Sequence, residues 1–267
     1  MPTSTYCHIP TVARYLQATM PDSVLDIGVG NGKMGFIVRD ILDVMMGERC
    51  MRKDWKIRLD GIEVFPGYIQ DHQRALYDDI LIGDAYETID GAGKYDLLIL
   101  GDVLEHFEKR KAWRFLDKCA AHSNRTIMIN IPLGDRWTQG TVHGNPHEEH
   151  RSFWNIGEFE LFTPQREIFG FPGPGEYGCL LVDKDDYLRH RIIEQADTLA
   201  SEKGTHEALI FLEASLPLVP KDKAVAFLLV DLLLKGGRTE DAILRLKRIA
   251  EEFPDDASAR QYLKMMG

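Results

Sequence analysis

Three glycines follow a short apolar run in the segment VLDIGVGNGKMG, which extends from Val24 to Gly35. Glycine lets the backbone bend sharply and lets a ligand approach without a clash with a Cβ atom. The apolar run has the length of a strand, and the residues after the glycines have the apolar spacing of a helix. Because a glycine-rich turn between a strand and a helix binds nucleotide-like ligands at the edge of a parallel sheet, the segment predicts a site of this kind.

Two phosphate-binding patterns do not fit this stretch. A P-loop ends in Gly-Lys followed by Ser or Thr, whereas Lys33 is followed by Met34. The dinucleotide fingerprint requires a third glycine where Lys33 stands, which argues against a dehydrogenase. The pattern that is present is an acid followed by three alternating glycines, namely Asp26, Gly28, Gly30 and Gly32. A glycine turn with a purely structural role is the alternative interpretation.

Polar residues also end three later apolar runs. They are Glu63 near the end of IRLDGIEVF, Asp84 and Ala85 after DILIG, and Asp102, Glu105 and His106 after LLILG. The carboxyl ends of parallel strands lie at one edge of a sheet, so we expect these side chains to surround the same ligand as the glycine turn. Taken singly, each acid could also be an ordinary solvated strand end.

In this order, the four motifs resemble those of the S-adenosylmethionine-dependent methyltransferases with the Rossmann-like fold. The resemblance implies that S-adenosyl-L-methionine is the cofactor and that the acid and the three glycines bind it. In that family Asp26 would orient the loop or the ammonium group of the ligand, and Glu63 would accept charge-assisted hydrogen bonds from both ribose hydroxyls. Asp84 and Ala85 would contact the adenine, and Asp102 would lie beside the methionine portion.

Apolar runs alternate with helical patterns up to about residue 186. Five short runs that are apolar on both faces predict central parallel strands at 24–28, 57–65, 79–85, 95–103 and 125–133. Helical spacing occurs between them at 34–47, 66–77 and 108–122, and two further strands are expected at 166–171 and 177–183. The predicted fold is therefore α/β, with a doubly wound, mostly parallel, seven-stranded Rossmann-like sheet in a methyltransferase domain over residues 1–186.

Strand signals stop beyond residue 186, and an internal repeat begins. Equivalent positions 34 residues apart are Ala208 and Ala242, Leu212 and Leu246, and Pro220 and Pro254. This period, with Gly237 at a helix–helix turn, resembles the tetratricopeptide repeat, although the signature Trp and Tyr of that repeat are absent. We predict a small all-α helical-repeat appendage over residues 187–267, with an ordinary four-helix appendage as the alternative.

The loop after the fifth predicted strand, residues 132–160, is rich in His, Trp and charged residues. In the family that the sequence resembles, this loop borders the pocket of the methyl acceptor. Imidazole groups titrate near neutral pH, which suits removal of a proton from an acceptor hydroxyl, and His150 and His106 are the predicted catalytic residues. Phe153 and Trp154 are expected to form a wall of the pocket while His150 faces the acceptor.

Metal binding is a second interpretation of this loop, and plain loop polarity is a third. The candidate ligands are His143, His147 and His150, with Glu148 and Glu149 beside them. HEEH lacks the HExxH spacing that places two histidines on one face of a helix, and the Gly-Asn-Pro before it favours a loop. We therefore predict no metal among the site residues.

The segment PHEEHRSFW resembles a loop of methyltransferases from bacterial polysaccharide and secondary-metabolite clusters, which implies a small-molecule acceptor such as a sugar or metabolite hydroxyl. The Asn/Asp-Pro-Pro-Tyr motif of enzymes that methylate amino groups is absent after the fourth strand, where GDVLE stands. The sequence thus favours an enzyme that acts on a small molecule. In such an enzyme the helical repeats would mediate self-association or hold a carrier. The alternative is an interaction protein, whose helical repeats recruit a protein partner or protein substrate.

Composition excludes several other classes of protein. The net charge of −10 argues against a broad nucleic-acid surface, and no apolar run approaches the ~20 residues that a membrane span needs. The first residues do not have the pattern of a secretory signal. The four cysteines are scattered and form no CxxC pair, which indicates reduced thiols in a cytoplasm. We expect neither nucleic acid nor a membrane as a partner.

Overall fold

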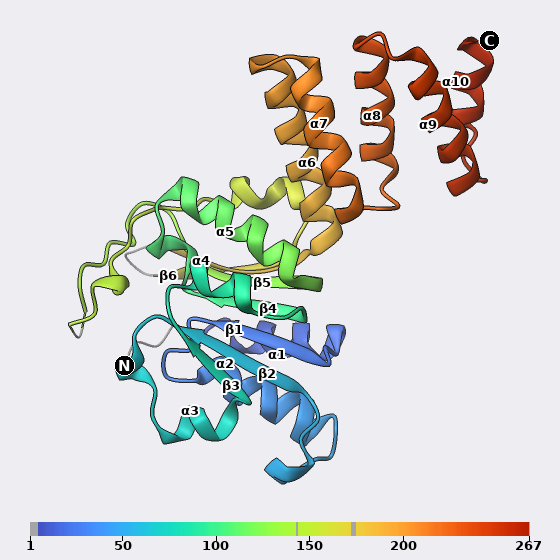
Figure 1. The fold of residues 1–267 in the computed structure, drawn as a ribbon. Coiled ribbons are helices and arrows are strands. Elements are labelled where there is room, and N and C mark those ends of the chain that lie inside the picture. Colours follow the sequence, from blue (N-terminus) through green and yellow to red (C-terminus); the bar gives the residue numbers. More distant parts are fainter. Residues whose placement is uncertain (1–4, 143, 172–174, 267) are drawn as a thin grey trace. The chain divides into compact units, whose positions relative to one another are not determined.

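The computed structural model describes residues 5–142, 144–171 and 175–266. The chain divides into two compact units, Met1–Lys184 and Asp185–Gly267. The first unit contains all the strands of the sheet, and the second consists of helices (Figure 1).

One seven-stranded sheet forms the centre of the first unit, with the strand order β3-β2-β1-β4-β5-β7-β6. The strands are β1 (Ser23–Ile27), β2 (Arg58–Glu63), β3 (Asp79–Ile82), β4 (Tyr95–Gly101), β5 (Ser123–Leu133), β6 (Gln165–Phe171) and β7 (Gly175–Asp183). The first five pair in parallel, and β7 is antiparallel to both β5 and β6. The prediction of a doubly wound, mostly parallel seven-stranded sheet is confirmed.

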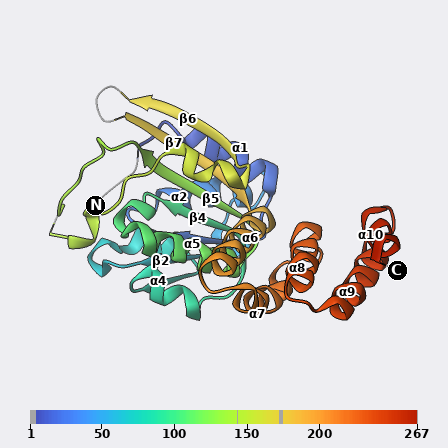
Figure 2. The same ribbon diagram turned by 90° about the horizontal axis from the view of Figure 1, so that it is seen from above.

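Helices cover both faces of this sheet, which explains why its central strands are apolar on both sides. Helices α1 (Ile9–Thr19), α2 (Lys33–Val38) and α3 (Asp71–Leu76) lie on one face, and α4 (Ala85–Thr88) and α5 (Lys109–His122) lie on the other (Figures 1 and 2). The core under α1 and α2 is continuous with residues of the strands, among them Val24, Leu59 and Leu97, which are fully buried.

Two of the predicted helices are irregular. Helix α2 continues as a π-helical segment, Arg39–Met45, in which the buried Arg39 guanidinium binds the Asp43 carboxylate at 2.8 Å. The helix expected over 66–77 is interrupted: a 3₁₀ turn covers Pro66–Tyr68, and α3 begins only at Asp71. The interruption has a local cause, because the extended Gln70 caps α3 in a capping box with Gln73.

The second unit contains helices α6 (Lys184–Glu202), α7 (Thr205–Ser215), α8 (Lys223–Lys235), α9 (Thr239–Glu252) and α10 (Ser258–Met266), with a 3₁₀ turn at Leu216–Leu218. From α7 onward, each helix contacts the next one along the chain. The repeat positions Leu212 and Leu246 are fully buried, on α7 and α9 respectively. Gly237 has a φ of +74° at the turn between α8 and α9, a conformation that favours glycine.

Helix α8 is the most apolar helix of this unit, and its residues Leu229, Val230 and Leu232 are buried. This agrees with the apolar character of the sequence AVAFLLVDLLL on nearly all sides. Within the described part of the chain, no helix combines the length and the apolar character that crossing a membrane requires.

Removal of residues 185–267 should leave a protein that still folds, because the sheet and the helices on both of its faces belong to the first unit. Thermal unfolding followed by far-ultraviolet circular dichroism should show one cooperative transition for residues 1–184. A truncated protein without a cooperative transition would contradict the division of the chain into two domains.

Candidate active site

A cavity of about 440 Å³ lies at the carboxyl ends of the parallel strands. Its volume is in the range of roughly 300–1,000 Å³ that is usual for small-molecule sites. Most of the residues predicted from the sequence line it together, namely Gly28, Gly30, Glu63, Asp84, Ala85, Asp102, His106 and His150. Asp26 and Gly32, which were also predicted, are not among its lining residues.

The glycine loop between β1 and α2 requires glycine at its bends. Gly28, Gly30 and Gly32 have φ values of +81°, +51° and +81°. A Cβ atom on Gly28 would lie 2.8 Å from Cγ2 of Val103, closer than atoms of a real side chain approach. The loop therefore follows a path that other residues adopt only with strain, and this path brings its backbone to the edge of the cavity.

Glu63, at the end of β2, connects this loop to the neighbouring strand. Its Oε2 accepts a hydrogen bond from the Gly30 N–H at 2.8 Å, and its Oε1 accepts one from the Phe65 N–H at 2.9 Å. Burial raises the pKa of the carboxyl, and these two backbone donors oppose the rise because they stabilise the charged form. A carboxylate has about four acceptor positions, so two remain for a ligand in the cavity.

Asp26 lies behind the glycine loop rather than in the cavity. It is 1% exposed, and its carboxylate accepts a hydrogen bond from the Tyr77 hydroxyl. The same hydroxyl accepts the Gly35 N–H at 3.0 Å, so that Tyr77 connects β1 to the first turn of α2. Burial raises the pKa of Asp26 to about 7. Of the two roles considered for Asp26, this geometry favours orientation of the loop.

Asp84 and Ala85 lie where β3 leads into α4. The Asp84 side chain caps this helix by accepting the Tyr86 N–H at 2.8 Å. It also pairs with Nζ of Lys111 at 3.2 Å, although both side chains are 41% exposed. The cap and the ion pair fix the carboxylate at the rim of the cavity, next to the small Ala85 side chain.

Asp102 follows β4 and has a φ of +54°, which is uncommon for a residue other than glycine. Its carboxylate accepts a hydrogen bond from the Tyr177 hydroxyl at 2.8 Å. Strand β7 contributes Tyr177, and this bond thus connects the antiparallel part of the sheet to the turn after β4. Positive-φ residues often occur at functional sites, where the surrounding structure holds them in place.

A 3₁₀ turn, Leu104–His106, follows Asp102 and brings two titratable side chains to the cavity. Glu105 is 1% exposed, and burial together with the charge of Asp102 raises its pKa well above the usual range. His106 has a pKa lowered to about 4, mainly by burial, so its imidazole is neutral near pH 7. Its Nδ1 lies 3.1 Å from the carbonyl oxygen of Glu149.

The long loop after β5 brings His150 to the same place. Nδ1 of His150 lies 2.7 Å from the Trp137 carbonyl oxygen, and its backbone N–H bonds to the Gln139 carbonyl oxygen at 2.9 Å. The rings of His106 and His150 meet edge to face, with centroids 5.1 Å apart. The two predicted catalytic histidines, which are 44 residues apart in the sequence, are therefore neighbours.

The other residues of the histidine-rich loop have different positions. His147 lines the cavity, and so does Glu148, whose carboxylate accepts a hydrogen bond from the Asn145 side chain at 3.2 Å. Glu149 is not a lining residue. His143, which was also considered as a metal ligand, lies outside the described residues.

The expectation that Phe153 and Trp154 form a wall of the pocket is wrong. Neither residue lines the cavity. Trp154 is fully buried and packs against Trp113 of α5 and against Phe159, with ring centroids 5.2 and 5.3 Å away. Burial of these apolar rings is energetically favourable, and it anchors the end of the loop to the protein core. Phe153, in contrast, is 42% exposed.

Other aromatic and polar residues line the cavity instead, and the sequence did not single them out. They are Tyr68, Phe107, Trp137, Gln139, Asn145 and Tyr177. Tyr177 lies in a predicted strand. It is an aromatic residue with a polar hydroxyl among aliphatic neighbours, and this feature of the sequence could have indicated that it faces the cavity. For Trp137 and Gln139 no such signal existed, because an irregular loop has no periodicity that shows which side chains face inward.

Comparison with known proteins finds a family match in the second unit. Residues 199–264 match the tetratricopeptide repeat family, which confirms the resemblance predicted for this segment. No match was found among curated proteins.

Among solved structures, the chain is similar to an O-methyltransferase family protein from Burkholderia thailandensis, with 14% identity and a TM-score of 0.45 over 66% of this chain. The match covers 54% of that protein, so the chain corresponds to about half of its length.

Two further similar structures contain ligands. One is 1,6-didemethyltoxoflavin-N1-methyltransferase from Burkholderia thailandensis, with bound 1,6-didemethyltoxoflavin and S-adenosylhomocysteine, at 16% identity and a TM-score of 0.47 over 66% of this chain and 78% of that chain. The other is magnesium protoporphyrin IX methyltransferase from Synechocystis PCC 6803 with bound SAM, at 16% identity and a TM-score of 0.43 over 66% and 77% of the two chains. Similarity at this level concerns the fold alone.

The bond between Tyr77 and Asp26 generates a prediction about stability. The change Tyr77→Phe leaves the buried Asp26 carboxylate and the Gly35 N–H without their shared partner, and unfolding in urea should show a loss of about 1–3 kcal/mol. Tyr6→Phe is the matched control, since Tyr6 is 81% exposed, and it should change stability by less than about 0.5 kcal/mol. Equal stability of the Tyr77→Phe variant and the wild type would contradict this role of Tyr77.

Proposed function

We propose that the protein is an S-adenosylmethionine-dependent methyltransferase that acts on a hydroxyl group of a small molecule, such as a sugar or a secondary metabolite. The observation that carries this proposal is the buried Glu63 carboxylate, which faces the cavity and binds the Gly30 N–H of the glycine loop. A glycine loop after one strand and a buried carboxylate at the end of the adjacent strand are a combination that suits few ligands. The usual ligand of such a site is a nucleoside, whose ribose diol donates to the carboxylate.

The residues around the cavity fit this cofactor. A ribose diol presents two donors, and the two remaining acceptor positions of Glu63 match them in charge-assisted hydrogen bonds. Gly28 and Gly30 line the cavity without a side chain, so a ligand can approach their backbone closely. Asp84 and Ala85 supply an acceptor and a small apolar surface at the rim, which suit an adenine ring. Carboxylates in the lining also favour the cationic sulfonium and ammonium groups.

When bound, S-adenosylmethionine supplies a methyl group on a positively charged sulfur, and the departing thioether needs no acid. The protein therefore has two tasks, to align the acceptor and to remove its proton. His106 and His150 lie on the acceptor side, on the turn after β4 and on the loop after β5. With Nδ1 of His150 donating to the Trp137 carbonyl oxygen, its Nε2 keeps a lone pair that accepts the acceptor's proton.

A second candidate function rests on the helical repeats. The second unit matches the tetratricopeptide repeat family, whose repeats are protein-interaction modules. Three of its apolar residues, Ile210, Leu244 and Met265, are more than half exposed. In this alternative the repeats recruit a protein partner or a protein substrate, or join two copies of the chain.

The role of Glu63 is tested by cofactor binding. Glu63→Ala should weaken the binding of S-adenosylmethionine, measured by isothermal titration calorimetry, by roughly 1.5–3 kcal/mol, the range for hydrogen bonds to a charged group. Glu87→Ala is the control, because Glu87 is exposed on α4 and does not line the cavity. If the folded wild-type protein binds no S-adenosylmethionine, the proposed function is wrong.

The role of the histidine pair is tested by turnover, once an acceptor has been found by screening for release of S-adenosylhomocysteine. His150→Ala should lower turnover by about 10²–10⁴-fold and leave cofactor affinity unchanged, while His106→Ala should perturb both, because His106 lies in the turn that follows Asp102. The exposed His206 of α7 provides the control variant His206→Ala, with unchanged kinetics. Wild-type turnover in His150→Ala would remove this residue from the mechanism.

A further inference from the structure

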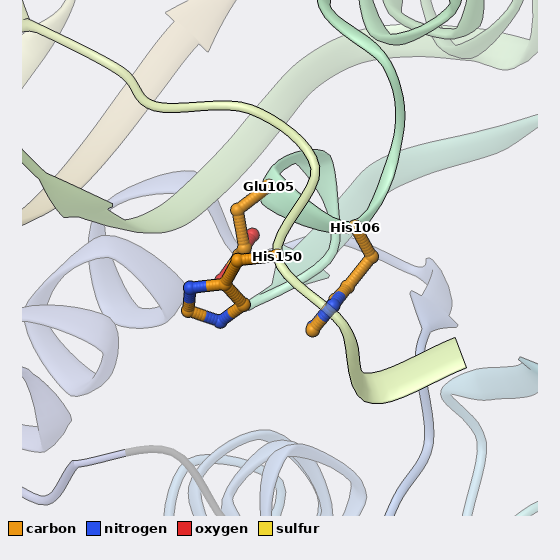
Figure 3. Close-up of side chains that lie close together, drawn as sticks. All are labelled: Glu105, His106 and His150. Carbon is orange, nitrogen blue, oxygen red and sulfur yellow. The ribbon is translucent and has the colours of Figure 1, made fainter. Parts of the chain in front are cut away.

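We propose that Glu105, His106 and His150 form a binding site for a divalent transition-metal cation on the acceptor side of the cavity. The role of the cation in methyl transfer rests on the proposed function, whereas the binding of the cation does not. Figure 3 shows the three side chains converging from two segments that are remote in the sequence, the turn after β4 and the loop after β5.

The distances between the three groups suit a single cation. One potential ligand atom from each residue lies within 4.8 Å of the other two. Metal–nitrogen and metal–oxygen bonds of about 2.0–2.2 Å place two ligands of one cation at most about 4.4 Å apart. Three ligands of a tetrahedral cation lie roughly 3.3–3.6 Å from one another, so side-chain movements of about 1 Å close the cluster around an ion.

Each of the two imidazole groups makes the backbone contact that is usual for a metal-binding histidine. Nδ1 of His106 contacts the Glu149 carbonyl oxygen, and Nδ1 of His150 contacts the Trp137 carbonyl oxygen. A carbonyl oxygen can only accept, so each Nδ1 carries the proton and each Nε2 has its lone pair available. Metal-bound histidines usually donate their second N–H to a backbone carbonyl or a carboxylate in this way.

Glu105 supplies the second, independent observation. Its side chain is almost completely buried, and among the described residues neither of its carboxylate oxygens has a hydrogen-bond partner. A buried carboxylate without a partner is energetically costly, and coordination of a cation removes that cost. The backbone of the same residue is fixed, because its carbonyl oxygen accepts the N–H groups of Arg151 and Ser152 at 2.7 and 3.1 Å.

The surrounding charges favour a cation. The carboxylates of Asp102 and Glu148 both act on Glu105, and both residues line the cavity. The opposing charges are those of Arg151, which acts on His106 and whose guanidinium lies 3.6 Å from the Glu149 carboxylate, and of Lys33, which lines the cavity and interacts with Asp102. The acidic groups Asp102, Glu148 and Glu105 thus outnumber these two cationic groups around the two imidazole ligands.

The ligand set indicates which cations bind. Two imidazole nitrogens and one carboxylate oxygen suit first-row transition metals such as Mn²⁺, Co²⁺ and Zn²⁺, whereas Mg²⁺ and Ca²⁺ prefer oxygen ligands. Three protein ligands leave at least one coordination position open, as catalytic metal sites do. Because all three ligands line the cavity, that position is accessible to an acceptor oxygen. A cation there lowers the pKa of a bound hydroxyl, and it takes over the activation that a free His150 would otherwise provide.

The test is binding of the metal alone to the full chain after removal of metals by a chelator. Mn²⁺ binding followed by electron paramagnetic resonance, Co²⁺ binding followed by visible absorption, and Zn²⁺ binding followed by calorimetry should each show one site per chain for at least one of these cations. Loss of a partner that only orients a ligand costs about 10–100-fold in metal affinity, so loss of a ligand itself should cost at least about 100-fold. Glu105→Gln, which keeps the shape of the side chain, and His150→Ala should both show this loss.

The matched control is His122→Ala. The Nδ1 of His122 also lies 3.1 Å from a backbone carbonyl oxygen, that of Gly93, but His122 is not part of the cluster. This variant should bind the metal as the wild type does. Wild-type protein that binds none of the three cations, or ligand variants that bind as tightly as the His122→Ala control, would overturn the metal site.

Titration of the same samples with S-adenosylmethionine separates the two proposals. Cofactor binding without binding of any cation would overturn the metal site and leave the proposed function intact. Metal binding without cofactor binding would support the metal site and contradict the proposed function.

Discussion

The hydrogen bond between the Glu63 carboxylate and the Gly30 N–H is the interaction on which the candidate site depends. It joins the ends of two adjacent parallel strands. It also fixes the glycine loop in one conformation, with positive φ angles, among the several that glycine residues can adopt. Tyr77 supports the same loop from behind, through Asp26 and the first turn of α2. The buried acid in the cavity therefore has two functions: it shapes the backbone cradle, and it keeps acceptor positions for a ligand.

The side of the cavity that carries His106 and His150 depends on a different interaction, the docking of a long loop. Trp154 anchors the end of this loop among the rings of Trp113 and Phe159, and the carbonyl oxygen of Glu105 accepts two N–H groups from the loop. These contacts bring His150 next to His106. A buried aromatic anchor outside the cavity thus fixes the position of polar groups inside it, and the cavity is preorganised on both of its sides.

Much of the fold follows from sequence patterns, because they reflect local physics. Strands buried on both faces are uniformly apolar, and positions such as Gly28 and Glu63 stand at strand ends, where a parallel sheet places its ligands. The repeat period in the second unit is equally visible, and Leu212 and Leu246 are buried as a repeat requires. The irregular loop was different: Trp154 was expected in the pocket and lies in the core, since only tertiary packing decides which side of a loop faces inward. The same limitation applied to Glu105, whose lack of a hydrogen-bond partner is visible only in three dimensions.

The central claim is that the cavity between the glycine loop and Glu63 holds the nucleoside of a methyl donor. A crystal structure of the protein with S-adenosylhomocysteine tests it most directly, since it shows where the ribose lies. The account predicts both ribose hydroxyls within hydrogen-bond distance of the Glu63 carboxylate, the adenine beside Asp84 and Ala85, and the sulfur directed toward His106 and His150. A ligand bound elsewhere on the chain, or a ribose that makes no contact with Glu63, would contradict the account.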